Sequence, residues 1–113
     1  MVILNILKMA EEKGTLALQV SVTDEDGDAV TPTALTWTLS DRDGTVINSR
    51  EDVVVVMASS TTTIYLAGDD LQIVDDSNDQ EFRWFTVKTD MGDVAKPQRV
   101  EKGFWVKNLV NVA

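Results

Sequence analysis

Apolar and polar side chains alternate strictly over residues 15–23. The apolar ones take every second position: Leu16, Leu18, Val20 and Val22. The positions between them hold Thr, Ala, Gln and Ser. Successive side chains of a β-strand point to opposite faces, so this period places the four apolar residues on one side. The segment therefore predicts a half-buried antiparallel strand.

The same period recurs along the chain, with Gly, Pro and Asp clusters between the repeats. Further strands are predicted over residues 35–39, 45–49, 61–66 and 81–89, over the β-branched run at 53–57, and over a last strand that contains Val100, Phe104 and Val106. The other side chains expected to face inward are Leu35, Trp37, Leu39, Ile64, Leu66, Phe85 and Val87. Residues 41–44 are typical of a tight hairpin turn with Gly44 at positive φ.

The apolar N-terminal run, residues 2–10, fits two structures. Ile3, Ile6, Leu7 and Ala10 would share one face of a helix that stops at Gly14. We favour a strand, because residues 11–14 then form a turn into the strand that follows.

The count is seven or eight short strands, with turn signals about every 8–12 residues, which is typical of a β-sandwich. The 113 residues, 43% of them apolar, suit one globular domain over residues 1–113. The sequence therefore predicts an all-β sandwich of antiparallel strands.

Charge and composition exclude several classes of function. Ten basic and nineteen acidic residues give a net charge of −9, which argues against nucleic acid as a partner. Cys and His are absent, which excludes disulfides, thiolate or imidazole metal sites and His-dependent nucleophiles. The lack of disulfides fits a reducing compartment. The N-terminal apolar run is far shorter than the roughly 20 residues of a membrane-spanning helix, and no secretion signal is visible.

Thirteen of the nineteen carboxylates fall in four predicted loops. The loops at 24–32 and 90–98 should share one pole of the sandwich, with Asp24, Glu25, Asp26, Asp28, Asp90 and Asp93. The turn at 41–44 and the loop at 68–80 should share the other, with Asp41, Asp43, Asp69, Asp70, Asp75, Asp76 and Asp79. We interpret these residues as turn formers that keep the surface soluble. Calcium, which takes 6–8 oxygen ligands, is the alternative, although EF-hand spacing is absent.

No catalytic or cofactor-binding residue is predicted. A carboxylic acid needs an apolar pocket to raise its pKa for acid catalysis, and these carboxylates lie in polar, Gly-rich loops. The hydroxyl run at residues 59–63 has no neighbouring base to activate it. The protein is therefore expected not to be an enzyme.

The alternation of side chains between the two faces of a strand places two tryptophans on the outside of the sandwich. If Phe85 and Phe104 face the core, then Trp84 and Trp105 face away from it. Two outward indoles on neighbouring strands would form an apolar interface, joined by Leu109 and Val110 of the apolar tail. The alternatives are that a terminal segment covers one indole, or that the register is shifted by one residue.

The order of features resembles an immunoglobulin-like sandwich. A Lys-Gly-Thr-Leu turn at residues 13–16 leads into an alternating strand, and Trp37 lies in the third strand. A narrower resemblance is to small immunoglobulin-like proteins of tailed bacteriophages and prophages, carried by residues 23–32, 36–41, 44–50 and 104–112. These are turn and core motifs, so the resemblance implies a fold more strongly than a role.

The resemblance implies a structural virion protein: a head decoration, a minor capsid protein, or a connector or tail accessory. Such a protein is assembled in the host cytoplasm, binds other virion proteins or itself, and needs no cofactor, nucleic acid or membrane. Two alternatives stay open. One is an adhesive module that binds host-surface carbohydrate, for which Trp105 is the candidate. The other is a spacer from a larger bacterial surface protein, which the start at Met1 argues against.

Overall fold

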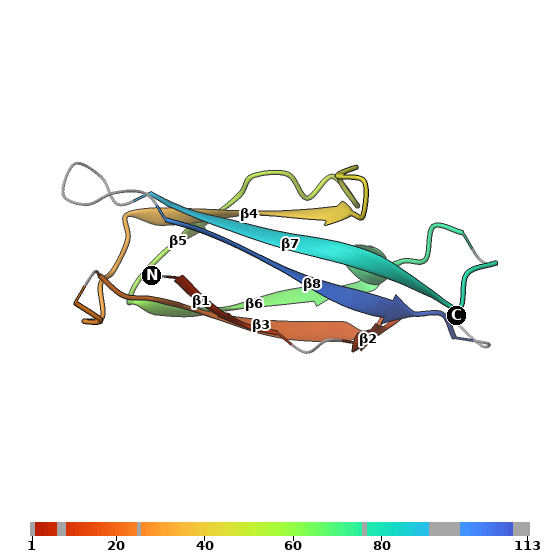
Figure 1. The fold of residues 1–113 in the computed structure, drawn as a ribbon, viewed down its shortest axis with the longest axis horizontal. Coiled ribbons are helices and arrows are strands. Elements are labelled where there is room, and N and C mark those ends of the chain that lie inside the picture. The colour runs from red at the N-terminus through yellow and green to blue at the C-terminus, as the bar shows by residue number, and fades with distance from the viewer. Residues whose placement is uncertain (1, 7–8, 25, 76, 91–97, 110–113) are drawn as a thin grey trace.

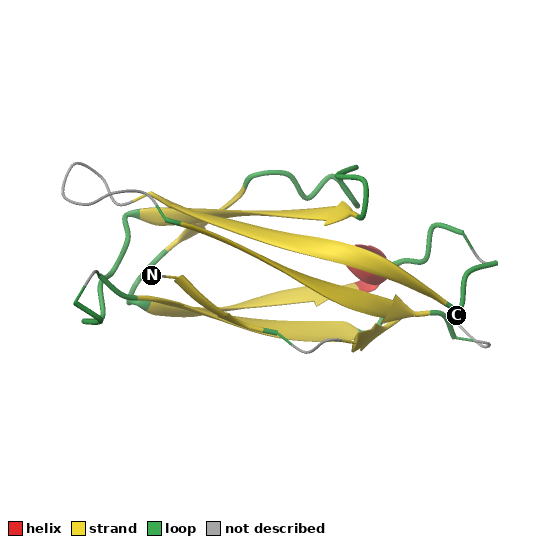
Figure 2. Ribbon diagram, in the orientation of Figure 1, coloured by secondary structure: helices red, strands yellow, loops and turns green. Residues whose placement is uncertain are grey.

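A computed structural model describes residues 2–6, 9–24, 26–75, 77–90 and 98–109. It is all-β, with eight strands in two sheets and one short helical turn (Figures 1 and 2). The elements are β1 (Val2–Asn5), β2 (Met9–Glu11), β3 (Thr15–Val22), β4 (Ala34–Asp41), β5 (Val53–Val56), β6 (Thr61–Ala67), the 3-10 helix η1 (Gly68–Leu71), β7 (Gln80–Asp90) and β8 (Arg99–Lys107).

The two sheets pack face to face. One has the order β1-β3-β6, and the other has the order β2-β8-β7-β4-β5. The prediction that all strands are antiparallel is wrong at one position, because β2 pairs with β8 in parallel. The reason lies in the N-terminal segment, which leaves the first sheet after β1 and joins the second beside a strand of the same direction (Figure 1).

The predicted alternation forms the core. Leu16, Leu18, Val20 and Val22 of β3 are buried, and the side chains between them face outward. The other side chains predicted to face inward are also buried, apart from Val100, which is half-buried against the core. Trp37 stacks on Phe85 with ring centroids 5.3 Å apart, so this aromatic pair lies at the centre of the five-stranded sheet's inner face.

The N-terminal run is extended, as favoured, and not helical in its described part. It forms β1 and then β2, which belong to different sheets. The turn predicted at residues 11–14 is present, with Gly14 N–H donating to the carbonyl of Glu11. Leu7, which the helical alternative required, lies outside the described residues.

The return strand predicted over residues 45–49 is wrong. Only an isolated bridge joins Val46 to Ser40, because the chain then turns at Asn48 and Ser49, whose φ angles are 53° and 56°. Two successive left-handed residues cannot continue a strand. The hairpin turn before this segment is confirmed, with Gly44 at φ 91°.

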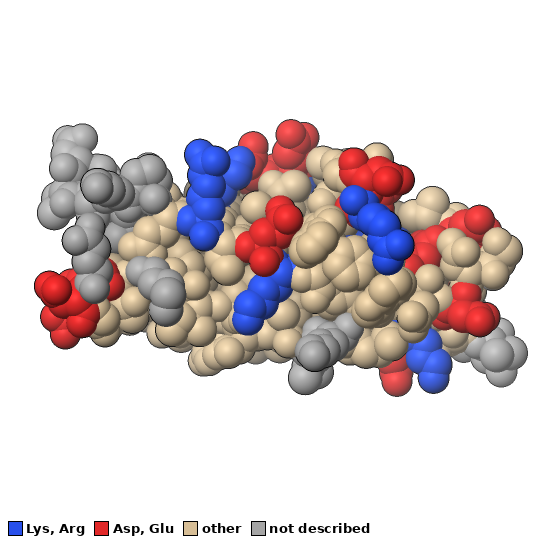
Figure 3. All heavy atoms as spheres, in the orientation of Figure 1, with Lys and Arg blue, Asp and Glu red and all other residues tan. Residues whose placement is uncertain are grey.

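Acidic side chains gather at both ends of the long axis, with mixed charge and uncharged surface between them (Figure 3). At one end, Gln98 Nε2 donates to the Thr23 carbonyl over 3.1 Å, which joins the predicted loops there. At the other, the turn at 41–43 and Val74 line one pocket. In the described ranges, no helix is long and apolar enough to cross a bilayer.

Candidate interaction surface

Three aromatic side chains form a cluster on the outer face of the five-stranded sheet. Phe82 of β7 is directly opposite Trp105 of β8, and Trp84 follows two residues later on the same face. The Phe82 ring meets Trp84 edge-on at 4.8 Å between centroids and Trp105 at 5.2 Å. Such edge-to-face pairs contribute about 0.5–1.5 kcal/mol each beyond burial. We call Phe82, Trp84 and Trp105, with Arg42, the aromatic face.

Gly103 makes room for this cluster. It is paired with Trp84 on the neighbouring strand, and a methyl group at its Cβ position would overlap the Phe82 ring. Glycine weakens a strand interior, and a cross-strand aromatic ring that covers it restores packing. Glycine at position 103 of β8 therefore leaves room for the tip of the Phe82 ring.

Arg42 covers the cluster from a neighbouring turn. Its guanidinium carbon lies 5.4 Å from the Phe82 centroid and 5.3 Å from the Trp105 centroid, within cation–π range. Asp41 fixes this turn, since its Oδ1 accepts the backbone N–H groups of Asp43 and Thr45, each over 2.9 Å. The turn thus places one positive charge on the aromatic face.

The structure places Trp84 and Trp105 on the outer face, and the register that puts Phe85 and Phe104 in the core is confirmed. Both indoles are half-buried rather than fully exposed. The Phe82 ring contacts both indoles, and the Arg42 guanidinium lies over Trp105. Met9 of β2, paired with Trp105, extends the apolar surface and is 43% exposed.

Sequence reasoning nominated the two indoles but missed Phe82 and Arg42. Phe82 has the same parity as Trp84, so the alternation that placed Trp84 outward could have found it. Arg42 lies in a turn, and no periodic signal reports where a turn side chain points.

The tail is described only in part. Leu109 is half-buried, and its N–H donates to Glu12 Oε1 over 3.2 Å. Asn108 N–H donates to the Asp79 carbonyl over 2.9 Å, which ties the end of β8 to the preceding loop. Leu109 therefore follows the edge of the sheet beside β2, while Val110 lies outside the described residues.

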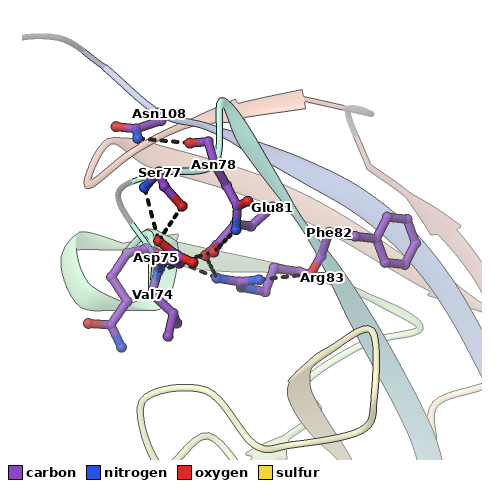
Figure 4. Close-up of polar contacts among 9 residues, drawn as sticks. Val74, Asp75, Ser77, Asn78, Glu81, Phe82, Arg83 and Asn108 are labelled. Atoms are coloured by element: carbon purple, nitrogen blue, oxygen red, sulfur yellow. Dashed lines mark hydrogen bonds and ion pairs between the residues drawn. The ribbon is translucent and has the colours of Figure 1, made fainter.

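A buried ion pair holds the loop at residues 72–80 against β7 (Figure 4). Arg83 Nη2 donates to Glu81 Oε1 over 2.8 Å and to the Gln72 carbonyl over 3.0 Å. The Glu81 carboxylate also accepts the N–H of Val74 over 2.6 Å and the side chain of Asn78 over 2.9 Å. Burial favours the protonated acid, but these hydrogen bonds outweigh it and lower the pKa of Glu81 from 4.5 to about 2.

The prediction that Asp70 is a solvent-exposed loop carboxylate is wrong. It is 2% exposed and accepts hydrogen bonds from Arg50 Nε at 2.7 Å and Asn48 Nδ2 at 2.8 Å. Burial opposes its ionisation, but the hydrogen bonds from Arg50, Asn48 and Ala67 and the charge of Arg50 hold the pKa of Asp70 below its usual value. Asp70 therefore joins η1 to the turn that follows β4.

The acidic loops contain one turn motif twice, Asp-x-Asp-Gly. Asp24 Oδ1 accepts the N–H groups of Asp26 and Asp28, as Asp41 does in the second copy, and Gly27 has φ 84°. The carboxylates of Asp24, Asp26 and Asp28 lie within 4.8 Å of one another. These hydrogen bonds make Asp24 a turn former, as the sequence predicted. The other carboxylates assigned to this pole, Glu25, Asp93 and the side chain of Asp90, lie outside the described residues, as does Asp76 at the second pole.

We expect calcium to leave the stability unchanged. A ligand that binds only the folded state raises its melting temperature by mass action. Because turn hydrogen bonds already occupy Asp24 Oδ1, thermal melts in millimolar calcium and in chelator should coincide. A calcium-dependent rise that the Asp26→Asn variant abolishes would contradict this expectation and assign a metal site to the loop.

Neither a protein-family profile nor a curated protein matches this chain.

Proposed function

We propose that the protein is a non-enzymatic structural component of a tailed-phage particle, either a head decoration or minor capsid protein or a connector or tail accessory. It is assembled in the host cytoplasm and binds another virion protein through the aromatic face. The observation that carries the proposal is the cluster of Phe82, Trp84 and Trp105 under Arg42, on the outside of a sheet that has no catalytic constellation among its described residues.

The strand order supports the immunoglobulin-like part of this proposal. Variable-type immunoglobulin domains have strands A, B, E and D in one sheet and G, F, C, C′ and C″ in the other, and the described residues contain no counterpart of D or C″. Here β1-β3-β6 takes the place of A-B-E, and β8-β7-β4-β5 takes that of G-F-C-C′. Trp37 lies on β4, the strand that corresponds to C, where such domains bury a tryptophan.

The composition of the aromatic face supports protein binding. Trp, Phe and Arg are enriched at protein interfaces, and residues that dominate the binding energy are mostly Trp, Tyr and Arg. The net charge of −9 opposes unspecific association of the subunits, while Arg42 provides a cation over the Phe82 and Trp105 rings. A partner surface with a carboxylate facing Arg42 and an apolar pocket for Trp105 would complement it.

The carboxylates support a role without catalysis. The pKa values of Asp70 and Glu81 lie below their usual range, because several donors outweigh the effect of burial. Hydrogen bonds from Ser77 also lower the pKa of Asp75. A general acid at neutral pH needs the opposite shift.

Trp105→Ser tests the proposal. We expect the variant to fold, with a loss on the order of 1 kcal/mol, because Trp105 is half-buried on the outer face. Incorporation into particles should fall at least tenfold, the effect of losing roughly 1.4 kcal/mol or more of binding energy. The measurement is quantitative mass spectrometry of purified particles after complementation of a gene deletion.

Tyr65→Ser is the matched control, because Tyr65 is a 66% exposed aromatic residue on the outer face of the other sheet. Its particles should contain the wild-type amount. Wild-type protein that is absent from purified particles would refute the proposal. Equal incorporation of the Trp105 and Tyr65 variants would show that the aromatic face does not mediate incorporation into particles.

Carbohydrate binding is the second candidate, and one observation favours it. Trp105 and Phe82 line a shallow pocket with polar side chains that include Asn78, Gln80 and Asp43. A sugar would have to displace Arg42 from the Trp105 ring before stacking on it. A glycan array that compares the wild type with Arg42→Ala tests this, since removal of the guanidinium should strengthen any sugar binding.

A further inference from the structure

The longest uncharged stretch of the chain forms one lateral side of the sandwich. Residues 53–68 contain no Asp, Glu, Lys or Arg, although 26% of the chain is charged. This stretch contains β5 and β6, which are the terminal strands of their two sheets on the same side. Natural proteins usually protect sheet edges with Lys, Pro or a covering segment. Neither Lys nor Pro occurs here.

β5 in particular carries exposed apolar side chains at this edge. Val54 is 64% exposed and Val56 is 81% exposed, whereas Val53 and Val55 pack against the core. Among the residues that the structure describes, all four pair with β4 alone. β5 therefore has one side available for another strand.

The backbone groups of β5 that do not bond β4 belong to Val54 and Val56, the two residues with exposed side chains. Leu39 N–H donates to the Arg50 carbonyl, so the odd-numbered residues of β4 direct their backbone groups toward β5. Residues that face each other in an antiparallel pair alternate between bonded and non-bonded. Leu35 and Trp37 thus bond Val55 and Val53, which leaves the N–H and C=O groups of Val54 and Val56 directed away from β4.

We propose that β5 pairs antiparallel with β5 of a second copy of this chain, about a two-fold axis at Val55. Val54 of each copy then exchanges two backbone hydrogen bonds with Val56 of the other. Their side chains pack as cross-strand neighbours on the outer face. The two five-stranded sheets become one continuous sheet.

The positions of the charged residues around β5 are compatible with a second copy paired in this register. Glu51 and Asp52 precede β5, and uncharged residues follow it. Antiparallel pairing centred on Val55 places Asp52 opposite Ala58 and Glu51 opposite Ser59, so acidic residues do not face one another. Asp52 is also compensated within its own chain by Lys88, whose Nζ lies 3.9 Å from Asp52 Oδ1. Elsewhere on a surface of charge −9, two copies repel.

The test is sedimentation velocity of the full chain from micromolar to near-millimolar concentration. Wild-type protein should form a dimer that strengthens with added salt, because salt screens the repulsion between copies. Val56→Lys should weaken dimerisation about tenfold or more, since it places a lysine on each side of the pairing. This change reduces the net negative charge, so general repulsion cannot explain the loss. Val54→Thr, which stays β-branched and uncharged, should change the dissociation constant by less than about threefold.

Cysteine pairing tests the register, because the chain has no cysteine of its own. A mixture of Val54→Cys and Val56→Cys chains should form a disulfide-linked heterodimer under mild oxidation, since bonded antiparallel partners have Cα atoms about 5.5 Å apart. Either chain alone should crosslink far less, because identical positions are two residues out of register.

Wild-type protein that stays monomeric over the whole range at high salt would overturn the proposal. So would a dimer that Val56→Lys leaves unchanged and Trp105→Ser abolishes, because the copies would then associate through the aromatic face. Circular dichroism and melting of Val56→Lys, which should match the wild type, show that a lost dimer is not lost folding. If this variant is unfolded, the crosslinking result decides.

Discussion

Trp37→Ala should lower the free energy of unfolding by about 3–5 kcal/mol, much of the stability of a domain this small. Trp37 is 6% exposed and stacks on Phe85, so truncation removes a large apolar contact and leaves a cavity at the middle of the five-stranded sheet. Chemical denaturation followed by far-UV circular dichroism measures the change.

Trp84→Ala is the matched control, since it removes the same side chain from the opposite face of the same sheet. Its loss should be less than half as large, because Trp84 is only half-buried. Equal losses in the two variants would contradict the assignment of inner and outer faces.

Acid should destabilise the protein as the pH falls from about 4.5 to about 2, and Glu81 should supply a distinct part of that loss. The pKa of Glu81 is lower in the folded state than in the unfolded chain, so the unfolded chain takes up its proton first as the pH falls. The contribution is therefore complete above the unfolded value and disappears toward the folded one. A shift of this size corresponds to at most about 3 kcal/mol.

Glu81→Gln isolates this contribution. The variant should be less stable than the wild type at pH 7, and the difference should shrink to little by pH 2, where about half of the folded wild-type carboxylate and nearly all of the unfolded one is protonated. Glu51→Gln, which removes an exposed carboxylate outside the network, controls for the loss of one charge. A stability difference between Glu81→Gln and the wild type that does not change with pH would show that Glu81 acts through packing alone.

Much of the fold could be predicted because alternation is a local property. Leu16 to Val22 and Leu35 to Leu39 each report their buried face without knowledge of their partners. The same rule placed Trp84 and Trp105 outward. Strand pairing depends on contacts between residues far apart in the chain. The sequence therefore did not show that β2 joins β8 in parallel or that the run at residues 2–10 is divided between two sheets.

For the candidate site, the sequence predicted only that the side chains of Trp84 and Trp105 face outward. Phe82 and Trp105 become neighbours through the register of β7 with β8, and the glycine that makes room for the ring lies on the other strand. Arg42 lies in a turn and Asp70 in a 3-10 helix, and in such segments no periodic sequence pattern predicts where a side chain points. Asp70 was therefore expected among solvated loop carboxylates, yet it is buried beside Arg50.

By itself, the sequence determined that this chain forms strands, which side chains of the alternating strands face the core, and that catalysis through Cys or His is excluded. These follow from a two-residue period and from the presence or absence of functional groups. The tertiary structure decided which strands are neighbours, which ring covers Gly103 and which edges stay unpaired. Those features depend on contacts between residues far apart in the chain, and a local pattern carries no information about what lies across a sheet or at its edge.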